Sequence, residues 1–329
     1  MGSGRWSTDV YSARESKRKA SGKSAFEYSE TVKRSGKLKV HPSLDPHGVT
    51  FRESRDSAEH PATNAISVMF DVTGSMGGVP VQLQKYLPQL LGLLLYRNYI
   101  SSPQILFGAI GDALSDRVPL QVGQFESDNR MDENLQNIVL ERGGGPYGME
   151  SYELALYFMA RHTAIDCYEK RKKKGYLFMI GDEMAYPKVD RKQVDSIVDG
   201  GLEASIRLED MIAEVKEKYN LYFIVPVAAS GGNADRIYTF WKERLGEQHV
   251  IRLDKVESIA ETIALTIGTN EGRIGLDDGV EDLKEMGSDA STISSVKKAL
   301  SILPVSNSVV KSEGSLGNLD EKSSKTRRL

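Results

Sequence analysis

The feature that most constrains this chain is the stretch from Ala65 to Gly78, which reads Ala-Ile-Ser-Val-Met-Phe-Asp-Val-Thr-Gly-Ser-Met-Gly-Gly. An apolar run typical of a buried parallel strand ends in an aspartate, two alternating hydroxyls and glycines. Asp71, Thr73 and Ser75 offer one carboxylate and two hydroxyl oxygens, and the glycines let the backbone turn tightly. Oxygen ligands suit hard cations such as Mg²⁺ better than zinc or copper. The stretch therefore predicts a site for a small hard cation at a sheet edge.

Strand-like and helix-like runs alternate regularly after this stretch. The strand-like runs are Ile66–Asp71, Ile105–Gly111, Pro119–Gln124, Gly175–Ile180, Leu221–Val227 and His249–Leu253. The helix-like runs are Val81–Tyr99, Asp132–Leu140, Tyr152–Lys173, Leu202–Tyr219, Asp235–Leu245 and Glu257–Ile267. Short apolar strands separated by amphipathic helices predict an α/β fold, with a mostly parallel sheet and helices on both faces. Only the second and third strands lack room for a helix between them, so they should form an antiparallel hairpin.

Two further segments should reach the edge at which parallel strands end, where open α/β sheets bind their ligands. The first reads Arg-Gly-Gly-Gly-Pro-Tyr-Gly-Met-Glu-Ser over residues 142–151 and opens a predicted helix. The second is the apolar strand that ends in Gly181, Asp182 and Glu183. Glu150 or Ser151 can also cap the exposed N–H groups at the start of the helix. A ligand role and a capping role are compatible here.

Taken in order, the three segments resemble the motifs of von Willebrand factor A (VWA) domains. The first resembles their D-x-[ST]-x-S signature, which forms a metal-ion-dependent adhesion site. In the second VWA motif a threonine stands five residues before a small-apolar pair. Glu150 stands there in this chain, five residues before Ala155 and Leu156, and no threonine is nearby. The resemblance therefore leaves Glu150 and Ser151 both open as ligands. Asp182 corresponds to the aspartate that holds the metal in the third motif, often through water.

The resemblance implies a doubly wound, Rossmann-like VWA domain with six strands and one antiparallel edge hairpin. It also implies a bound Mg²⁺ or Mn²⁺, with the metal ligands drawn from Asp71, Thr73, Ser75, Glu150, Ser151 and Asp182. Three carboxylates would over-neutralise a dication and leave it a weak electrophile for a carboxylate of a partner. Such a site could hold loops in place more than it grips a ligand. By resemblance the chain is a protein–protein interaction module and not an enzyme, acting as a cytosolic adaptor in a multi-protein assembly, such as one containing an AAA+ ATPase.

One enzyme class is an alternative. Residues 71–75 also resemble the D-x-T-G-[ST] motif of haloacid-dehalogenase-type phosphotransferases, and Gly181-Asp182 faintly resembles their Mg²⁺-binding motif. Asp71 would then be the nucleophile. Against this, Thr73 occupies the place of the general acid of the phosphatase members, and the loop Gly143–Glu150 has no assigned role in that family.

The regions on either side of the alternating segment differ in composition. Residues 1–62 contain few aliphatic side chains, and between Arg14 and Lys39 nine basic residues face three glutamates, which predicts a basic, largely extended arm. Residues 63–272 form the predicted VWA domain. Residues 273–329 are rich in acidic, Ser and Thr side chains and are expected to be mostly disordered, although Val296–Leu303 could form one or two helical turns.

Charge and hydropathy limit the partners. The formal net charge of −3 argues against nucleic acid as a partner of the whole surface. The most apolar stretch, Leu87–Tyr96, is shorter than the roughly 20 residues that span a bilayer, so no membrane contact is expected. The single cysteine, Cys167, excludes an internal disulfide. With no secretory signal at the N-terminus, the prediction is a cytoplasmic protein.

Overall fold

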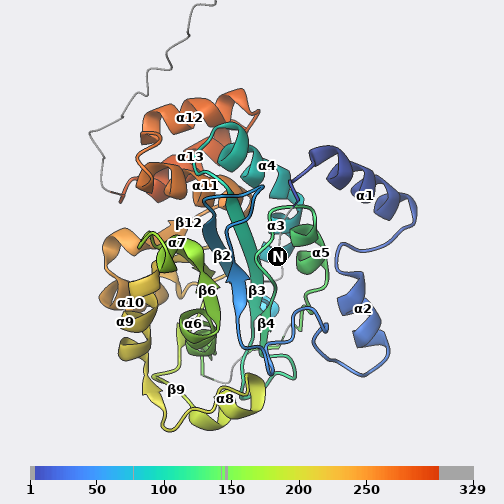
Figure 1. Cartoon of the computed structure of the whole chain (residues 1–329), viewed down its shortest axis with the longest axis vertical. Helices are drawn as coiled ribbons and strands as arrows, with labels where there is room; N and C mark the ends of the chain where they lie inside the picture. The colour runs from blue at the N-terminus through green and yellow to red at the C-terminus, as the bar shows by residue number, and fades with distance from the viewer. Residues whose placement is uncertain (1–3, 77, 142, 145–146, 304–329) are drawn as a thin grey trace, which may run out of the picture.

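A six-stranded sheet lies at the centre of the computed structural model, which describes residues 4–76, 78–141, 143–144 and 147–303 (Figure 1). Its strands are β2 (Asn64–Asp71), β3 (Pro103–Ile110), β4 (Leu120–Val122), β7 (Gly175–Ile180), β11 (Tyr219–Pro226) and β12 (Val250–Leu253). The spatial order is β12-β11-β7-β2-β3-β4. Every neighbouring pair is parallel except β3 and β4. The prediction of a mostly parallel α/β sheet with one antiparallel edge hairpin is therefore confirmed.

Helices cover both faces of this sheet, and the side chains of β2 alternate between the two cores. Ile66, Val68 and Phe70 join the first core, whereas Ala65 and Met69 join the second. The first core includes residues of α3 (Val79–Lys85), α4 (Leu87–Leu91), α5 (Arg130–Gln136) and α11 (Ile259–Asn270). The second includes residues of α6 (Tyr152–Arg161), α8 (Arg191–Ile197), α9 (Leu208–Lys218) and α10 (Ala234–Leu245). Burial on both faces explains the apolar run from Ala65 to Phe70, which only Ser67 interrupts.

Two of the predicted helices are interrupted. The predicted helix Tyr152–Lys173 is wrong over Thr163–Ile165, which form β6 and pair in parallel with β1 (Arg52–Ser54). The helix resumes only as the short α7 (Asp166–Glu169). A strand distant in sequence thus overrides the local helical pattern. The predicted helix Val81–Tyr99 consists of α3, α4 and a π-helical segment Gly92–Tyr96. Pro88, near the start of α4, has no N–H to donate to the carbonyl oxygen of Gln84.

The N-terminal region is helical and packed, so the prediction of a largely extended arm is wrong for much of it. It forms α1 (Thr8–Ala20) and α2 (Glu27–Arg34), which lie beside α3 and α5 at one side of the molecule (Figure 1). Trp6, Tyr11 and Phe26 are buried in the first core. The Tyr11 hydroxyl donates to the Gln84 carbonyl at 2.8 Å and so satisfies the acceptor that Pro88 leaves free. Aromatic anchors compensate here for the shortage of aliphatic side chains.

The C-terminal region also contains packed helices, α12 (Leu276–Glu285) and α13 (Ala290–Leu300). Leu283, Val296 and Leu300 are buried in the first core. The prediction of disorder is therefore wrong for these helices, whereas residues 304–329 lie outside the described residues. The helical turns expected within Val296–Leu303 are part of the longer α13. The domain boundaries at 62 and 272 remain predictions.

Short elements complete the fold near the ends of the central strands. They are β5 (Met149–Glu150) paired with β8 (Met184–Ala185), β9 (Lys188–Val189) paired with β10 (Ile206–Arg207), and 3₁₀ turns at Gly74–Met76, Glu247–His249 and Val256–Ser258. Cys167 is buried. Within the described residues, no helix has the length and apolar character needed to cross a membrane.

Candidate functional site

The ends of β2 and β7 bring the first and third sequence motifs to the same edge of the sheet. These strands are parallel neighbours, with Phe70 opposite Ile180, so Asp71 and Asp182 follow at nearly the same level. The glycine-rich second motif reaches this edge through a hydrogen bond of 2.9 Å from the Gly74 N–H to the Gly143 carbonyl. The three segments that the sequence analysis grouped are therefore close together.

Asp71 is fully buried and accepts three hydrogen bonds. Its Oδ1 accepts from the Thr73 N–H at 2.7 Å and from the Thr73 hydroxyl at 2.6 Å. Its Oδ2 accepts from the Tyr152 hydroxyl at 2.8 Å. Burial and the nearby Asp182 carboxylate raise the pKa of Asp71 to about 7, although the hydrogen bonds from Thr73 and Tyr152 act in the opposite direction. Both oxygens of this carboxylate thus have protein donors.

Asp182 is bonded differently. Its side chain is 3% exposed, yet its Oδ1 is buried and has no hydrogen-bond partner among the described residues. Burial raises the pKa of Asp182, and a hydrogen bond from the Ser75 hydroxyl partly offsets that rise. Ser75 itself is exposed on the 3₁₀ turn that follows Asp71. One side of the Asp71–Asp182 pair is therefore close to solvent.

Glu150 and Ser151, the two open candidates of the second motif, face different surroundings. Glu150 is buried in β5 opposite Ala185 of β8. Its negative charge contributes to raising the pKa of Tyr152 and of Tyr186. The Ser151 hydroxyl instead accepts from the Ala113 N–H at 2.9 Å, in the turn that follows β3. Ser151 makes no side-chain cap on α6, so the capping role predicted for it is wrong.

Two buried residues at this edge, Asp112 and Tyr152, are not among the site residues predicted from the sequence. A signal for Asp112 was present, because Ile-Gly-Asp occurs both at 110–112 and at 180–182. The signal for Tyr152 was weaker, since a tyrosine at a helix start is also an ordinary core residue. The two glycines of these turns make room for oxygen atoms: a methyl group at Gly181 would overlap the Tyr152 hydroxyl, and one at Gly111 would overlap the Asp116 carboxylate.

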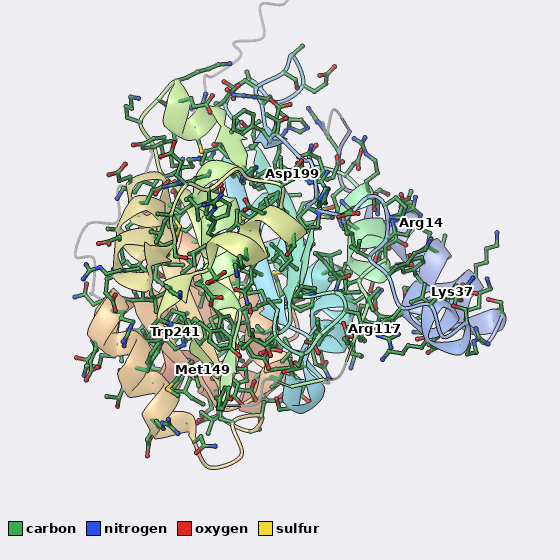
Figure 2. The ribbon with its side chains drawn as sticks, turned by 90° about the horizontal axis from the view of Figure 1, so that it is seen from below. Arg14, Lys37, Arg117, Met149, Asp199 and Trp241 are labelled. Atoms are coloured by element: carbon green, nitrogen blue, oxygen red, sulfur yellow. The ribbon has the colours of Figure 1, made fainter. Side chains whose placement is uncertain are left out.

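Two other observations bear on what this edge can bind. In the part of the chain that the structure describes, no three Asp, Glu, His or Cys side chains gather closely enough to hold a metal ion on their own. Any metal here would thus depend on hydroxyl groups and water as well. Met149 precedes Glu150 in the sequence, and Trp241 packs against Tyr152. Figure 2 shows both residues well apart from Arg14 and Lys37 of the N-terminal region.

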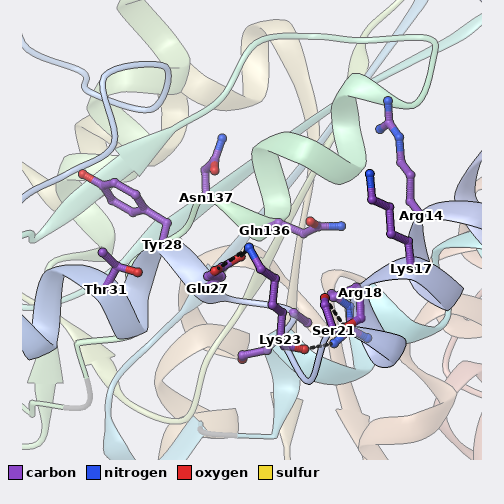
Figure 3. Close-up of a pocket in the computed structure, with 12 residues that line it drawn as sticks. Arg14, Lys17, Arg18, Ser21, Lys23, Glu27, Tyr28, Thr31, Gln136 and Asn137 are labelled. Atoms are coloured by element: carbon purple, nitrogen blue, oxygen red, sulfur yellow. Dashed lines mark hydrogen bonds and ion pairs between the residues drawn. The ribbon is translucent and has the colours of Figure 1, made fainter.

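The N-terminal helices line a hollow of about 570 Å³ that lies away from the sheet edge (Figure 3). Three of the cations that line it have partners within the protein, and the first of them, Arg14, pairs with Glu133 at 2.7 Å. Lys23 pairs with Glu27 at 2.8 Å, and the Arg18 guanidinium donates to the Lys23 carbonyl at 2.9 Å. Arg14, Arg18 and Lys23 are thus engaged in ion pairs within the protein.

Comparisons with known proteins do not assign a family. No family model and no curated protein matches the chain. Similar solved structures include the pilus adhesin SpaC from Lactobacillus rhamnosus GG in its open conformation, at 8% identity and a TM-score of 0.42, covering 63% of this chain and 30% of that one. Another is proximal thread matrix protein 1 from the mussel byssus, at 10% identity and a TM-score of 0.41, covering 63% and 47%. This chain therefore matches less than half the length of either protein.

Proposed function

We propose that this chain is a VWA-type interaction module that binds Mg²⁺ or Mn²⁺ at the carboxyl ends of β2 and β7. The parallel sheet, its antiparallel edge hairpin and its two helical layers support the doubly wound layout that the motifs imply. The proposal depends mainly on one observation, the Oδ1 atom of Asp182. A buried carboxylate oxygen without a donor, beside a second buried carboxylate, is costly unless a cation or water satisfies it.

The residues present fit a hard cation. The Thr73 hydroxyl donates a hydrogen bond to Asp71, and the Ser75 hydroxyl donates one to Asp182, so both hydroxyl oxygens keep lone pairs for a cation. Protein-bound Mg²⁺ typically uses one or two carboxylates and keeps several waters. A mixed set of Thr73, Ser75 and Asp182, with Asp71 positioning the first hydroxyl, is consistent with that preference. Glu150, whose charge contributes to raising the pKa of Tyr152, is the candidate from the second motif for a further ligand or for a contact to a bound water.

A cation at this position would neutralise the repulsion between Asp71 and Asp182 and hold together the three loops that carry the motifs. With the Asp71 and Asp182 carboxylates beside it, the cation would be a weak electrophile for a partner carboxylate. We therefore assign the ion mainly an ordering role. Leu114 and Tyr147, which are 57% and 68% exposed on the adjoining loops, supply apolar surface of the kind that protein partners contact.

The hydrogen bonding of Asp71 argues against the phosphotransferase alternative. A nucleophilic aspartate needs an oxygen that can approach phosphorus, whereas both Asp71 oxygens accept protein donors and the side chain is fully buried. Our proposal is accordingly a non-enzymatic, cytosolic adaptor in a multi-protein assembly. An AAA+ ATPase-containing complex is the setting that the VWA resemblance favours.

The proposal is tested by titrating the purified chain with MgCl₂ while its melting temperature is followed. Binding to the native state alone stabilises it by about 2.7 kcal/mol at a concentration of 100 times Kd, so the melting temperature should rise. Asp71→Ala should abolish the rise. A curve that millimolar Mg²⁺ and Mn²⁺ leave unchanged in the unmodified chain would contradict the proposal. The partner role is tested by comparing the proteins that co-purify with Mg²⁺ and with chelator.

A further inference from the structure

Tyr152 connects parts of the candidate site that are far apart in sequence. It is the first residue of α6, it is completely buried, and its hydroxyl donates to the Asp71 Oδ2 at 2.8 Å. The hydroxyl occupies space that any side chain at position 181 would need. Glycine at the end of β7 thus allows a phenol from α6 to reach a carboxylate at the end of β2.

The ring of Tyr152 is held by two further aromatic residues. It packs edge-to-face on Phe223 and Trp241, with ring centroids 5.4 and 5.6 Å away. The Trp241 indole N–H donates to the Glu183 carbonyl at 3.1 Å, in the segment that carries Asp182. The aromatic cluster that orients the Tyr152 hydroxyl therefore also fixes the backbone next to Asp182.

We propose that Tyr152 is a positioning residue that makes the site selective for Mg²⁺ and Mn²⁺ over Ca²⁺. The inference rests on the proposed function, since it concerns the same cation site. Mg²⁺ requires near-ideal octahedral geometry with short ligand distances, whereas Ca²⁺ accepts six to eight oxygens in flexible arrangements. The Tyr152 hydroxyl prevents Asp71 from rotating, and Asp71 in turn orients the Thr73 hydroxyl. Such rigidity favours the smaller ion.

The test compares Tyr152→Phe with a matched control on the same helix, Tyr157→Phe. Tyr157 is also buried, and its hydroxyl bonds to the Gly200 carbonyl at 3.4 Å, with Gly200 leaving space for it as Gly181 does for Tyr152. Each variant removes one buried hydroxyl from α6, but only Tyr152→Phe frees the Asp71 carboxylate. Isothermal titration calorimetry with MgCl₂ and with CaCl₂ gives both dissociation constants, and melting of the metal-free proteins reports on folding.

Tyr152→Phe should weaken Mg²⁺ binding about 10-fold or more, as loss of a hydrogen bond that orients a metal ligand typically does, and should affect Ca²⁺ binding much less. Tyr157→Phe should leave the ratio of the two constants unchanged. If Tyr152→Phe weakens both ions equally or neither ion, the positioning role is wrong while the metal site stands. If the unmodified chain binds neither ion, the proposed function fails first.

Discussion

The strands β3 and β7 both end in an isoleucine that is followed by Gly-Asp, yet the two aspartates have different environments. In the turn after β3, Asp112 accepts from the Leu114 N–H at 3.3 Å and from the Ser115 hydroxyl at 2.9 Å. In the turn after β7, the Asp182 Oδ1 lacks a hydrogen-bond partner among the described residues. Both aspartates are buried beside the end of β2. The first is a structural carboxylate, and the second is suited to bind a ligand.

The residues that follow each turn explain the difference. After Asp112 the chain folds back at once, because the Ser115 and Asp116 N–H groups both donate to the Asp112 carbonyl, at 3.2 and 2.8 Å. This tight turn supplies its own donors to the Asp112 carboxylate. After Asp182 the chain continues into β8, which pairs with β5. A strand directs its N–H groups to its neighbour, so few remain for the preceding carboxylate. The shared Gly-Asp motif therefore indicates that an aspartate lies at the sheet edge, whereas the residues that follow it decide whether protein donors satisfy its carboxylate.

The largest effect is expected from Asp112→Ala. It removes the acceptor of the Leu114 N–H and of the Ser115 hydroxyl, so the free energy of unfolding should fall by about 3 kcal/mol. Urea denaturation with and without Mg²⁺ measures this, and the stabilisation by Mg²⁺ should persist. A loss that appears only in the presence of Mg²⁺ would mean that Asp112, too, binds the ion.

Asp182→Asn should have the opposite effect: it should lose the stabilisation by Mg²⁺ without losing stability in the absence of metal. Without metal the variant should be as stable as the unmodified chain or slightly more stable, because the repulsion with Asp71 is removed. With Mg²⁺ at 100 times the Kd of the unmodified chain, it should lack the stabilisation of about 2.7 kcal/mol. Thermal melts in chelator and in Mg²⁺ separate the two effects. An unfolding free energy that falls in chelator would place Asp182 in the same structural class as Asp112.

Substitutions of Glu150 and Ser151 should have smaller effects, and these effects show which of the two residues contributes to the metal site. Glu150→Gln keeps the shape of the side chain but removes its charge, and it should weaken Mg²⁺ binding about 10-fold if Glu150 is a ligand or orients one. Ser151→Ala should cost about 1 kcal/mol of stability by leaving the Ala113 N–H without its acceptor, with the Mg²⁺ affinity unchanged. Calorimetry on the two variants decides the matter. A greater loss of affinity in Ser151→Ala would make Ser151 the ligand of the second motif.

The sequence predicted the sheet well because its signals are local. Each of the six strands was found from a short apolar run, and the hairpin of β3 and β4 from the shortness of the segment that joins them. The helical prediction over Tyr152–Lys173 failed where β1, over a hundred residues earlier, pairs with β6. The N-terminal helices were missed because their anchoring depends on partners such as Gln84, which no local pattern reveals.

The position of the segments that carry the candidate site was predictable to a similar extent, and their metal-binding role stays a prediction. Strand ends predicted Asp71, Thr73, Ser75 and Asp182, and their segments lie at one edge of the sheet. It did not find the bond from Tyr152 to Asp71, because that contact depends on the absence of a side chain at Gly181. It also could not decide between Glu150 and Ser151, since adjacent residues at a helix start can face opposite ways.

The central claim, a cation at the edge formed by Asp71, Ser75 and Asp182, is tested most directly by anomalous diffraction from crystals grown with Mn²⁺. Mn²⁺ scatters strongly at its absorption edge and replaces Mg²⁺ at oxygen sites. We predict one strong anomalous peak beside the Thr73 and Ser75 hydroxyls and the Asp182 carboxylate, and no peak beside Asp112. Ordered density for all three loops with no anomalous peak at that edge would contradict the account.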